Sequence, residues 1–437
     1  MDLVEKIFNA GIVGAGGGGF PSHIKAKSKV EFLLANGAEC EPLIHKDYEL
    51  MVNFPGKIID GIEHLLKQTN AKKTFVGIKE KNKKAIDSIA GAIKNPSINL
   101  TLLGDFYPSG DEYELVYAAT NRLIPPHGLP LDVGCLVNNV ETLYNISNAT
   151  EEIPITKKFL SVTGAVKNPK SFFVPVGTSF KELIELAGGT ALQDYGIFVS
   201  GILMGRLTFD IDEPVTKTTA GIIVLPINHY LIDRMKRPIH DMNRIGKSAC
   251  DQCSYCTEFC PRYLLGYDVQ PHKVMRSLAF TKTGESVWNQ YADLCCSCGL
   301  CSLYACPEDL YPREACNQGK DYLRKNGMRY EQPKEVKVHP MKEGRRVPLK
   351  MLMKKLQLTD YDKATPFEEI DYQPRRVKLL LKQHAGQPAK PVVVLNQKVR
   401  KGELVADVEP DKVGAKIHAS IDGVIKEITD NYIIIEN

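Results

Sequence analysis

The two stretches CDQCSYCTEFCP (residues 250–261) and CCSCGLCSLYACP (residues 295–307) decide the fold of the centre of this chain. The first has the spacing C-x2-C-x2-C-x3-C-P and the second the spacing C-x2-C-x2-C-x4-C-P. This order is typical of bacterial ferredoxins, in which three cysteines of one run and the fourth of the other hold each [4Fe–4S] cluster. The spacing therefore predicts a domain that carries two such clusters and passes single electrons.

The same rule assigns the ligands of each cluster. One cluster is expected on Cys250, Cys253, Cys256 and Cys306, and the other on Cys260, Cys295, Cys298 and Cys301. The neighbouring thiol Cys296 leaves the choice of ligand in the second run open, although only Cys295 fits the two-residue gap to Cys298.

Other uses of these cysteines fit the pattern less well. Disulfide frameworks belong to small secreted domains, and structural zinc sites use two separated pairs of ligands. Cys40, Cys135 and Cys316 lie outside the two runs and are expected to be small buried or free thiols.

Length and composition set outer limits on the function. A chain of 437 residues should form about three domains. A net charge of +4 is too small for a nucleic-acid-binding surface, and no apolar run reaches the roughly 18 residues of a membrane span. The first residues lack the basic and apolar regions of a signal peptide. Reduced thiols agree with a cytoplasmic protein.

Changes of pattern along the chain predict a multidomain protein of mixed α/β and α+β class. The expected parts are an α/β domain (1–155), a β-grasp domain (156–231), a helical two-cluster domain (232–330), a charged linker with one amphipathic helix (331–390) and a small β-sandwich (391–437).

In the first part, strands expected at 31–39, 74–78 and 98–104 alternate with helices at 56–68 and 83–94. This alternation is typical of a mostly parallel sheet. In the second part, 156–187 predicts a hairpin turning at Lys167–Lys170, followed by a helix over Ser179–Ala187. Between the cysteine runs, a helix is expected over 272–280.

Four polar or glycine-rich segments of the first part could bind a nucleotide. Glycines 14–19 allow backbone amides to approach a phosphate, although no lysine follows as in a P-loop. NGAECEP (36–42) and YPSGDE (107–112) follow strands, and VNNVET (137–142) opens a helix. Asparagine amides can both donate to and accept from a flavin edge. The carboxylates of Glu39 and Glu41 suit ribose hydroxyls.

These four segments resemble the flavin-binding segments of the respiratory NADH dehydrogenase flavoprotein subunit and of the Rnf-complex C subunit. The resemblance implies an FMN site and an NADH site. The FMN candidates are Gly14, Gly16, Gly17, Lys25, Asn36, Gly110, Asp111, Asn138, Asn139 and Thr142, and the nicotinamide candidates are Phe20, Glu41 and Glu112. Glu39 and Tyr107 belong to the same segments. Ala38 departs from the respiratory pattern, which has an acid there.

The order of domains narrows the resemblance. Rnf C subunits place their sandwich domain first, whereas this chain starts with the flavin segments and ends with the sandwich pattern. That order is similar, from end to end, to the cobalamin reductases of propanediol utilisation, and a close relative is the electron transfer protein associated with proline reductase.

The resemblance implies an NADH-dependent oxidoreductase that passes electrons through FMN and two clusters to cobalamin, with no catalytic acid or base, in the cytoplasm or in a bacterial microcompartment. Cobalamin or a terminal reductase would be the electron acceptor, and a partner enzyme or shell protein could bind. The alternatives are a donor to proline reductase or another anaerobic reductase, and a scaffold with an empty flavin site.

Two segments near the end have competing interpretations. PLKMLMKKLQL (348–358) is basic and amphipathic; it could dock on a partner or a membrane, although a solvated helix face is the preferred interpretation. Asp411-Lys412 resembles the turn of a lipoyl domain, which would make Lys412 a modification site, but an ordinary turn lysine is the preferred interpretation.

Overall fold

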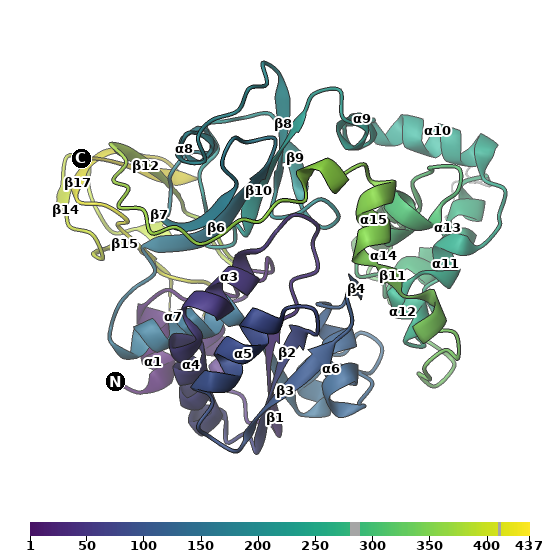
Figure 1. The fold of residues 1–437 in the computed structure, drawn as a ribbon, viewed down its shortest axis with the longest axis horizontal. Coiled ribbons are helices and arrows are strands. Elements are labelled where there is room, and N and C mark those ends of the chain that lie inside the picture. The colour runs from purple at the N-terminus through teal and green to yellow at the C-terminus, as the bar shows by residue number, and fades with distance from the viewer. Residues whose placement is uncertain (280–288, 410–411) are drawn as a thin grey trace.

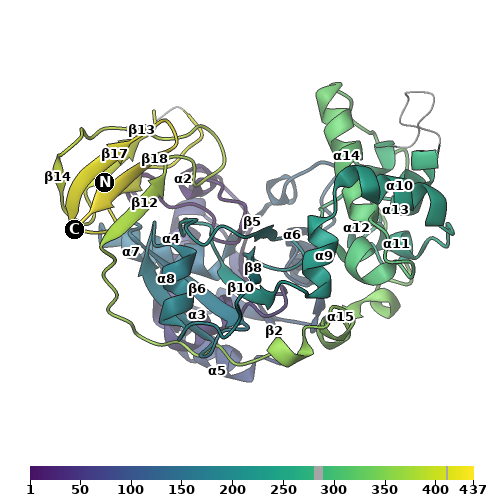
Figure 2. The same ribbon diagram turned by 90° about the horizontal axis from the view of Figure 1, so that it is seen from above.

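The computed structural model describes residues 1–279, 289–409 and 412–437. An amino-terminal α/β unit lies at the centre with a β-grasp unit beside it (Figure 1). The helical unit that carries the cysteine runs and the carboxy-terminal β-sandwich lie at opposite ends of the molecule (Figure 2). The predicted multidomain α/β class is confirmed.

The α/β unit is built on a wholly parallel sheet with the strand order β3-β2-β1-β5. Its strands are β1 (Phe32–Gly37), β2 (Lys73–Lys79), β3 (Ile98–Leu103) and β5 (Cys135–Asn139). Its helices are α1 (Leu3–Asn9), α2 (Ser22–Ala26), α3 (Lys46–Asn53), α4 (Pro55–Thr69), α5 (Lys83–Ala92), α6 (Glu112–Thr120) and α7 (Val140–Thr150). One core lies between the sheet and α1, α4, α5 and α7, and another between the sheet and α6.

Local sequence explains how these helices are placed. Pro55 starts α4 at a position where its missing N–H costs nothing, and Asn70 ends it in the left-handed region at φ 54°. Gly61 lets α4 approach α7 closely, because a Cβ there would lie 2.0 Å from the carbonyl oxygen of Leu143. The polar ends of β1 and β5 are thereby left at the carboxyl edge of the sheet, where open α/β sheets bind ligands.

The second unit has a five-stranded sheet with the order β7-β6-β10-β8-β9. Its elements are β6 (Lys157–Gly164), β7 (Lys170–Pro175), α8 (Phe180–Leu186), β8 (Tyr195–Val199), β9 (Arg206–Thr208) and β10 (Gly221–Pro226). The predicted hairpin and helix are both present. Ser179 and Glu182 form a capping box at the start of α8, as their spacing requires.

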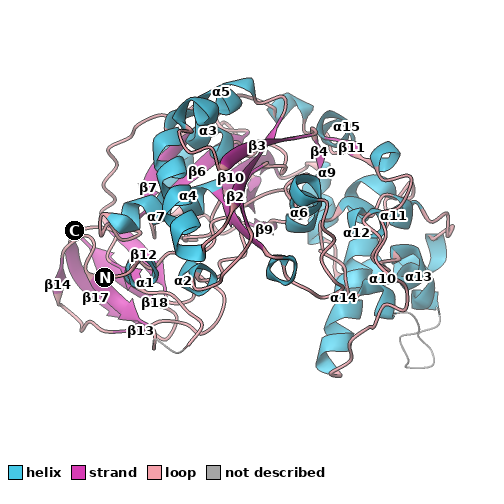
Figure 3. Ribbon diagram, turned by 90° about the horizontal axis from the view of Figure 1, so that it is seen from below, coloured by secondary structure: helices cyan, strands magenta, loops and turns pink. Residues whose placement is uncertain are grey.

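The third unit is helical (Figure 3). It contains α9 (Tyr230–Lys236), α10 (Ile239–Ala249), α11 (Tyr255–Glu258), α12 (Pro261–Leu264), α13 (Pro271–Ser277), η3 (Asn289–Ala292), the π-helical turn η4 (Cys301–Ala305) and α14 (Pro312–Lys325). The helix expected over 272–280 corresponds to α13, and Phe280 lies outside the described residues.

The amphipathic helix of the linker has a solvated basic face, as expected, with Lys350 and Lys354 exposed, and its apolar face is covered by this chain. Strand β11 (Val347–Pro348) pairs with β4 (Phe106–Tyr107) of the α/β unit, and α15 (Leu349–Lys355) follows directly. Leu352 and Leu356 are fully buried in a core that also contains Tyr107, Leu225 and Leu303. The apolar face of α15 is therefore covered by three other parts of the same chain.

From α15 the chain crosses the molecule to the sandwich (Figure 1). The sandwich contains a sheet with the order β12-β18-β17-β14 and another with the order β13-β15-β16. The strands are β12 (Arg376–Leu380), β13 (Lys390–Pro391), β14 (Lys398–Val399), β15 (Leu404–Asp407), β16 (Ile417–His418), β17 (Gly423–Ile428) and β18 (Tyr432–Glu436). Strand β12 comes from residues expected in the linker. The expected lipoyl-like turn includes Asp411, which lies outside the described residues.

The sandwich packs against the glycine-rich loop at the other end of the chain. The backbone N–H of Ala385 donates to the carbonyl of Gly19 at 3.0 Å. Nearby, the buried ammonium group of Lys217 donates to the carbonyls of Gly11 (2.7 Å) and Lys416 (2.6 Å), which joins three units. Across the described ranges, no helix is long and apolar enough to cross a bilayer.

The burial of α15 generates a test. We expect Leu352→Ala to destabilise the folded protein by about 2–5 kcal/mol, because it opens a cavity in a core shared by three units. Met351→Ala is the matched control; Met351 is 52% exposed, and its loss should change stability by less than about 0.5 kcal/mol. Thermal unfolding of the two variants measures the difference, and equal midpoints would contradict an internal role for α15.

Candidate functional site

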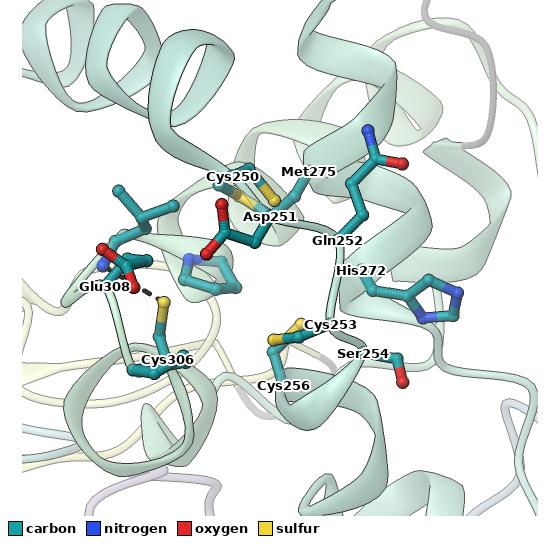
Figure 4. A pocket seen from close by; sticks show the side chains of 13 residues that line it. Cys250, Asp251, Gln252, Cys253, Ser254, Cys256, His272, Met275, Cys306 and Glu308 are labelled. Carbon is teal, nitrogen blue, oxygen red and sulfur yellow. Dashed lines mark hydrogen bonds between the residues drawn. The ribbon is translucent and has the colours of Figure 1, made fainter.

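Four of the predicted cluster ligands line one cavity. Cys250, Cys253 and Cys256 of the first run and Cys306 of the second line this cavity, together with Met275 and other side chains (Figure 4). Two residues of the intervening loop, Gln252 and Ser254, adopt left-handed backbone angles (φ 58° and 69°), which wraps the run around the cavity. The structure therefore brings together the set that the ferredoxin rule had grouped.

This cavity lies at the molecular surface. Cys253 is exposed and Cys250 is partly exposed, whereas Cys256 and Cys306 are buried. The backbone N–H of Leu310 donates to the sulfur of Cys306 at 3.3 Å, a type of bond that stabilises a thiolate. In the described part of the chain, no three His, Cys, Asp or Glu side chains are close enough together to bind a single metal ion. The four thiols are instead spaced around a cavity.

The other four predicted ligands gather deeper in the helical unit. Cys260 precedes α12, and the backbone N–H groups of Tyr263 and Arg262 at the start of this helix bond to its sulfur. The buried Cys301 lies within electrostatic range of Cys260 and of Cys295. It is also within range of Cys256 of the first set, so the two sets are neighbours.

Cys295 and Cys296 both reach this second set. The Cys295 thiol is hydrogen-bonded to the Cys316 thiol, which is the main cause that lowers the pKa of Cys295 to about 6. The Cys296 thiol is hydrogen-bonded to the Cys298 thiol, and this bond is the main cause that lowers the pKa of Cys296. Cys316, which sequence spacing left isolated, is thus part of the site; only the fold, which brings α14 next to the second run, reveals it.

The glycine-rich loop forms a compact turn over the carboxyl edge of the sheet. The N–H of Gly14 donates to the carbonyl of Phe20 at 2.9 Å, and the N–H of Ala15 donates to Oγ1 of Thr142 in α7 at 3.0 Å. Gly17 has a φ of 102°, and a Cβ on it would meet nothing within 4 Å. The loop therefore presents open backbone next to α7.

The remaining predicted flavin residues converge on the same edge. The Asn36 amide donates to the carbonyl of Gly110 at 2.9 Å, and the Asn139 amide donates to the carbonyl of Asn36 at 3.4 Å. Lys25 donates to the carbonyl of Val137 at 2.9 Å. Segments far apart in sequence, which begin at residues 14, 36, 107 and 137, are thus joined by hydrogen bonds.

Asn138 is the member of this group that lacks a partner. Its side chain is 5% exposed, and its amide nitrogen has no hydrogen-bond partner among the described residues. A buried unsatisfied donor is costly, so this amide is suited to a polar ligand at the sheet edge. The open backbone at Gly17 and the free amide of Asn138 both fit a bound flavin nucleotide.

Two carboxylates predicted for ribose or nicotinamide binding are engaged within the protein. Glu39 accepts the backbone N–H groups of Asp47 (3.0 Å) and Tyr48 (3.3 Å). Burial, followed by the charge of Asp47, raises the pKa of Glu39 to about 8. Glu41 accepts three consecutive N–H groups of the β-grasp loop, at 2.9, 3.0 and 2.8 Å from residues 202, 203 and 204. Glu41 therefore ties this loop to the α/β unit.

A buried charge network lies behind these residues. Lys158 of β6 donates to Oε1 of Glu141 at 2.6 Å, and Lys46 donates to Oε2 of Glu141 at 2.9 Å. Lys46 also pairs with Asp47, which accepts the Asn139 amide at 2.7 Å. Buried charges are tolerated when each finds partners of this kind. The network fixes the β-grasp unit against the predicted flavin segments, and pattern reasoning gave no sign of it.

The segment YPSGDE joins the predicted flavin site to the second cysteine set. Tyr107 is 2% exposed, and its hydroxyl donates to the backbone carbonyl of Cys298 at 2.7 Å. Asp111 pairs with Arg262 at 3.0 Å. Both residues were predicted to bind a cofactor, and both contact the helical unit. Of the three nicotinamide candidates, Glu41 is engaged within the protein as described above, whereas Phe20 and Glu112 are exposed.

Four family models match successive parts of the chain. The Nuo51 FMN-binding domain matches residues 7–148, and the SLBB domain matches 159–202. The 4Fe-4S dicluster domain matches 249–311, and the RnfC barrel sandwich hybrid domain matches 356–436.

Relatives match over different lengths. Cobalamin reductase PduS of Citrobacter freundii is 38% identical over 432 residues, covering 99% of this chain and 95% of the relative. The C subunit of the proton-translocating ferredoxin:NAD(+) oxidoreductase complex of Clostridium ljungdahlii is 35% identical over 269 residues, covering 60% of this chain and 56% of the relative. A crystal structure of an NAD+-reducing [NiFe]-hydrogenase aligns with 78% of this chain over 65% of the hydrogenase chain, with 18% identity and a TM-score of 0.49.

Identity at this level over nearly the whole of both chains shows the family. The FMN-binding and 4Fe-4S domains give it the cofactor equipment of an iron–sulfur flavoprotein. The chain therefore belongs to the family of the cobalamin reductase PduS and is an oxidoreductase of the electron-transferring iron–sulfur flavoprotein type.

Proposed function

We propose that this protein takes electrons from NADH at FMN and delivers them, through two [4Fe–4S] clusters, to cobalamin. One observation carries the proposal: the predicted flavin segments contact the second cysteine set through Tyr107 and Asp111, and the first cysteine set, next to the second, opens at the surface. This arrangement supports a single electron path that runs from the α/β unit to the surface.

The flavin site would be formed by the loop around Gly17, by Asn138 and by the residues that meet at the sheet edge. The bound FMN would supply hydride acceptance and single-electron release. The protein supplies position, since its backbone and amides are already held by bonds to Thr142 and Gly110. Phe20 and Glu112 are placed at the exposed side, where a nicotinamide nucleotide could approach.

The cluster ligands would be the two sets that the fold assembles. Cys250, Cys253, Cys256 and Cys306 would hold the surface cluster. Cys260, Cys298, Cys301 and either Cys295 or Cys296 would hold the inner one. Four thiolates around a shared volume suit iron–sulfur chemistry. The inner set contacts the α/β unit, so a cluster held there would be the nearer of the two to a bound flavin.

Cobalamin is the proposed acceptor because the relatives that match this chain end to end are named for its reduction. We also propose work in propanediol utilisation, within a microcompartment, because the order of domains resembles that of the cobalamin reductases of that pathway. The second candidate is an electron donor to a proline reductase or another partner reductase. The exposed position of Cys253 supports it, because a docked protein could approach the proposed surface cluster there.

The function can be tested on anaerobically purified protein. We expect one FMN and about eight irons per chain, because two cubes carry four irons each. NADH should bleach the flavin, and hydroxocobalamin should then be reduced without a second protein. Reduction that requires a partner reductase would favour the second candidate, and flavin that NADH does not reduce would contradict both.

Cys253→Ala tests the ligand assignment. The variant should lose about half of the iron, since one of two clusters lacks a ligand. Flavin content and its reduction by NADH should persist, because Cys253 lies in the surface set. Cys135→Ala is the control; this buried thiol belongs to β5 and should not affect iron content. Full iron in Cys253→Ala would contradict the assignment.

Glu39 predicts a pH dependence of stability. Its pKa of about 8 in the folded protein lies above the ordinary value of 4.5, so the folded state retains a proton that the unfolded chain releases. This contribution is fully present below about pH 4.5 and is lost as pH rises toward about 8. Glu39→Gln should therefore flatten the fall in unfolding temperature over this range, and an unchanged slope would contradict the raised pKa.

A further inference from the structure

We propose that Tyr107, Asp111 and Arg262 are positioning residues that hold the flavin-binding unit against the inner cluster site and control the passage of electrons between them. The inference rests on the proposed function and deepens it. The contacts of these three residues could not be predicted from the sequence, because they join segments about 150 to 190 residues apart.

Tyr107 is held on two sides. Strand β4, to which it belongs, pairs with β11 of the linker, and its buried hydroxyl donates to the carbonyl of Cys298 at 2.7 Å. Cys298 is a proposed ligand of the inner cluster. The backbone at one ligand position is therefore bonded directly to the flavin-binding unit.

Asp111 and Arg262 make a second, independent connection. Their side chains are only 14% and 10% exposed and approach to 3.0 Å. The other oxygen of Asp111 accepts the N–H groups of Tyr113 and Glu114 at the start of α6, which fixes the carboxylate. The Arg262 guanidinium also lies 3.5 Å from the centre of the Tyr113 ring. Arg262 is two residues after Cys260, another proposed ligand.

The same short segment also contacts the flavin residues. The carbonyl of Gly110 accepts the Asn36 amide at 2.9 Å, and a Cβ on Gly110 would lie 3.3 Å from the sulfur of Cys40. Residues 107–111 thus touch the proposed flavin site on one side and the inner ligands on the other. A shift of this segment changes the separation of the two redox groups, on which the rate of electron transfer depends steeply.

Arg262 adds an electrostatic effect. Its guanidinium lies within electrostatic range of the thiols of Cys295 and Cys296, and charge next to a cluster shifts its reduction potential. Positive charge favours the reduced, more negative state of the cluster. Removing Arg262 should therefore lower the potential of the inner cluster and leave that of the surface cluster unchanged.

The experiment follows flavin and cluster absorbance in anaerobic stopped flow for Tyr107→Phe, Asp111→Asn, Arg262→Gln and the last two combined. Flavin reduction by NADH should stay within about twofold in Arg262→Gln, because Arg262 lies outside the proposed flavin segments. Cluster reduction should slow by about tenfold in every variant, in the range of coupling energies between contacting residues. The double variant should be no slower than the slower single one, because both substitutions break the same pair.

Arg345→Gln is the matched control. Arg345 pairs with Glu258 at 2.7 Å and lies over the ring of Phe259. Both partners belong to the helical unit, so these two contacts do not connect the flavin-binding unit to the inner cysteine set. Both rates should therefore be unchanged. Redox titration followed by electron paramagnetic resonance supplies a readout independent of turnover, with a lower inner-cluster potential expected in Arg262→Gln. Arg262→Lys keeps the charge and should restore the potential.

Photoreduction of the flavin separates this inference from the proposed function. If NADH proves not to be the donor, illumination with a sacrificial amine donor, which is oxidised as the flavin is reduced, still loads the flavin, and slow cluster reduction in the variants still supports the positioning role. Wild-type cluster rates in all variants, or equal slowing in Arg345→Gln, would overturn it. Tyr107→Phe removes a single oxygen, so it keeps the test decisive if a charge variant fails to fold.

Discussion

The burial of the Tyr107 hydroxyl is the constraint on which the arrangement of this molecule depends. An unpaired buried hydroxyl would cost about 1–3 kcal/mol, and the carbonyl of Cys298 satisfies it at 2.7 Å. The ring lies in a core to which the α/β, β-grasp and helical units and the linker all contribute. No one of these units can close that core alone, so the cysteine runs, the glycine-rich loop and the linker helix are positioned by a shared apolar junction.

Around this junction the units are joined by polar contacts that require defined partners. Glu41 caps three amides of the β-grasp loop, and Lys158 reaches Glu141 in a buried network. At the far side, Ala385 of the sandwich bonds to Gly19. The last domain in sequence therefore contacts the first loop.

The features that depend on residues close together in the sequence could be predicted. Cysteine spacing grouped Cys250, Cys253, Cys256 and Cys306, which the structure places around one cavity, and alternation of strands and helices predicted the parallel sheet. The contacts between units could not be predicted. The solvated basic face of α15 was expected, but the residues that cover its apolar face lie elsewhere in the sequence and could not be named. In the same way, Asp111 and Glu41 matched cofactor motifs, while their partners, Arg262 and the amides of residues 202–204, could be identified only once the units had been assembled.

The unequal exposure of the two cysteine sets has a consequence for damage by oxygen. Cys253 lies at the surface, whereas Cys298 and Cys301 are enclosed by the junction. Oxygen or peroxide would meet the surface set first, and iron would be lost from the exit of the path before its entrance. On the proposed electron path, a protein injured in this way would still accept electrons but could no longer pass them to its acceptor.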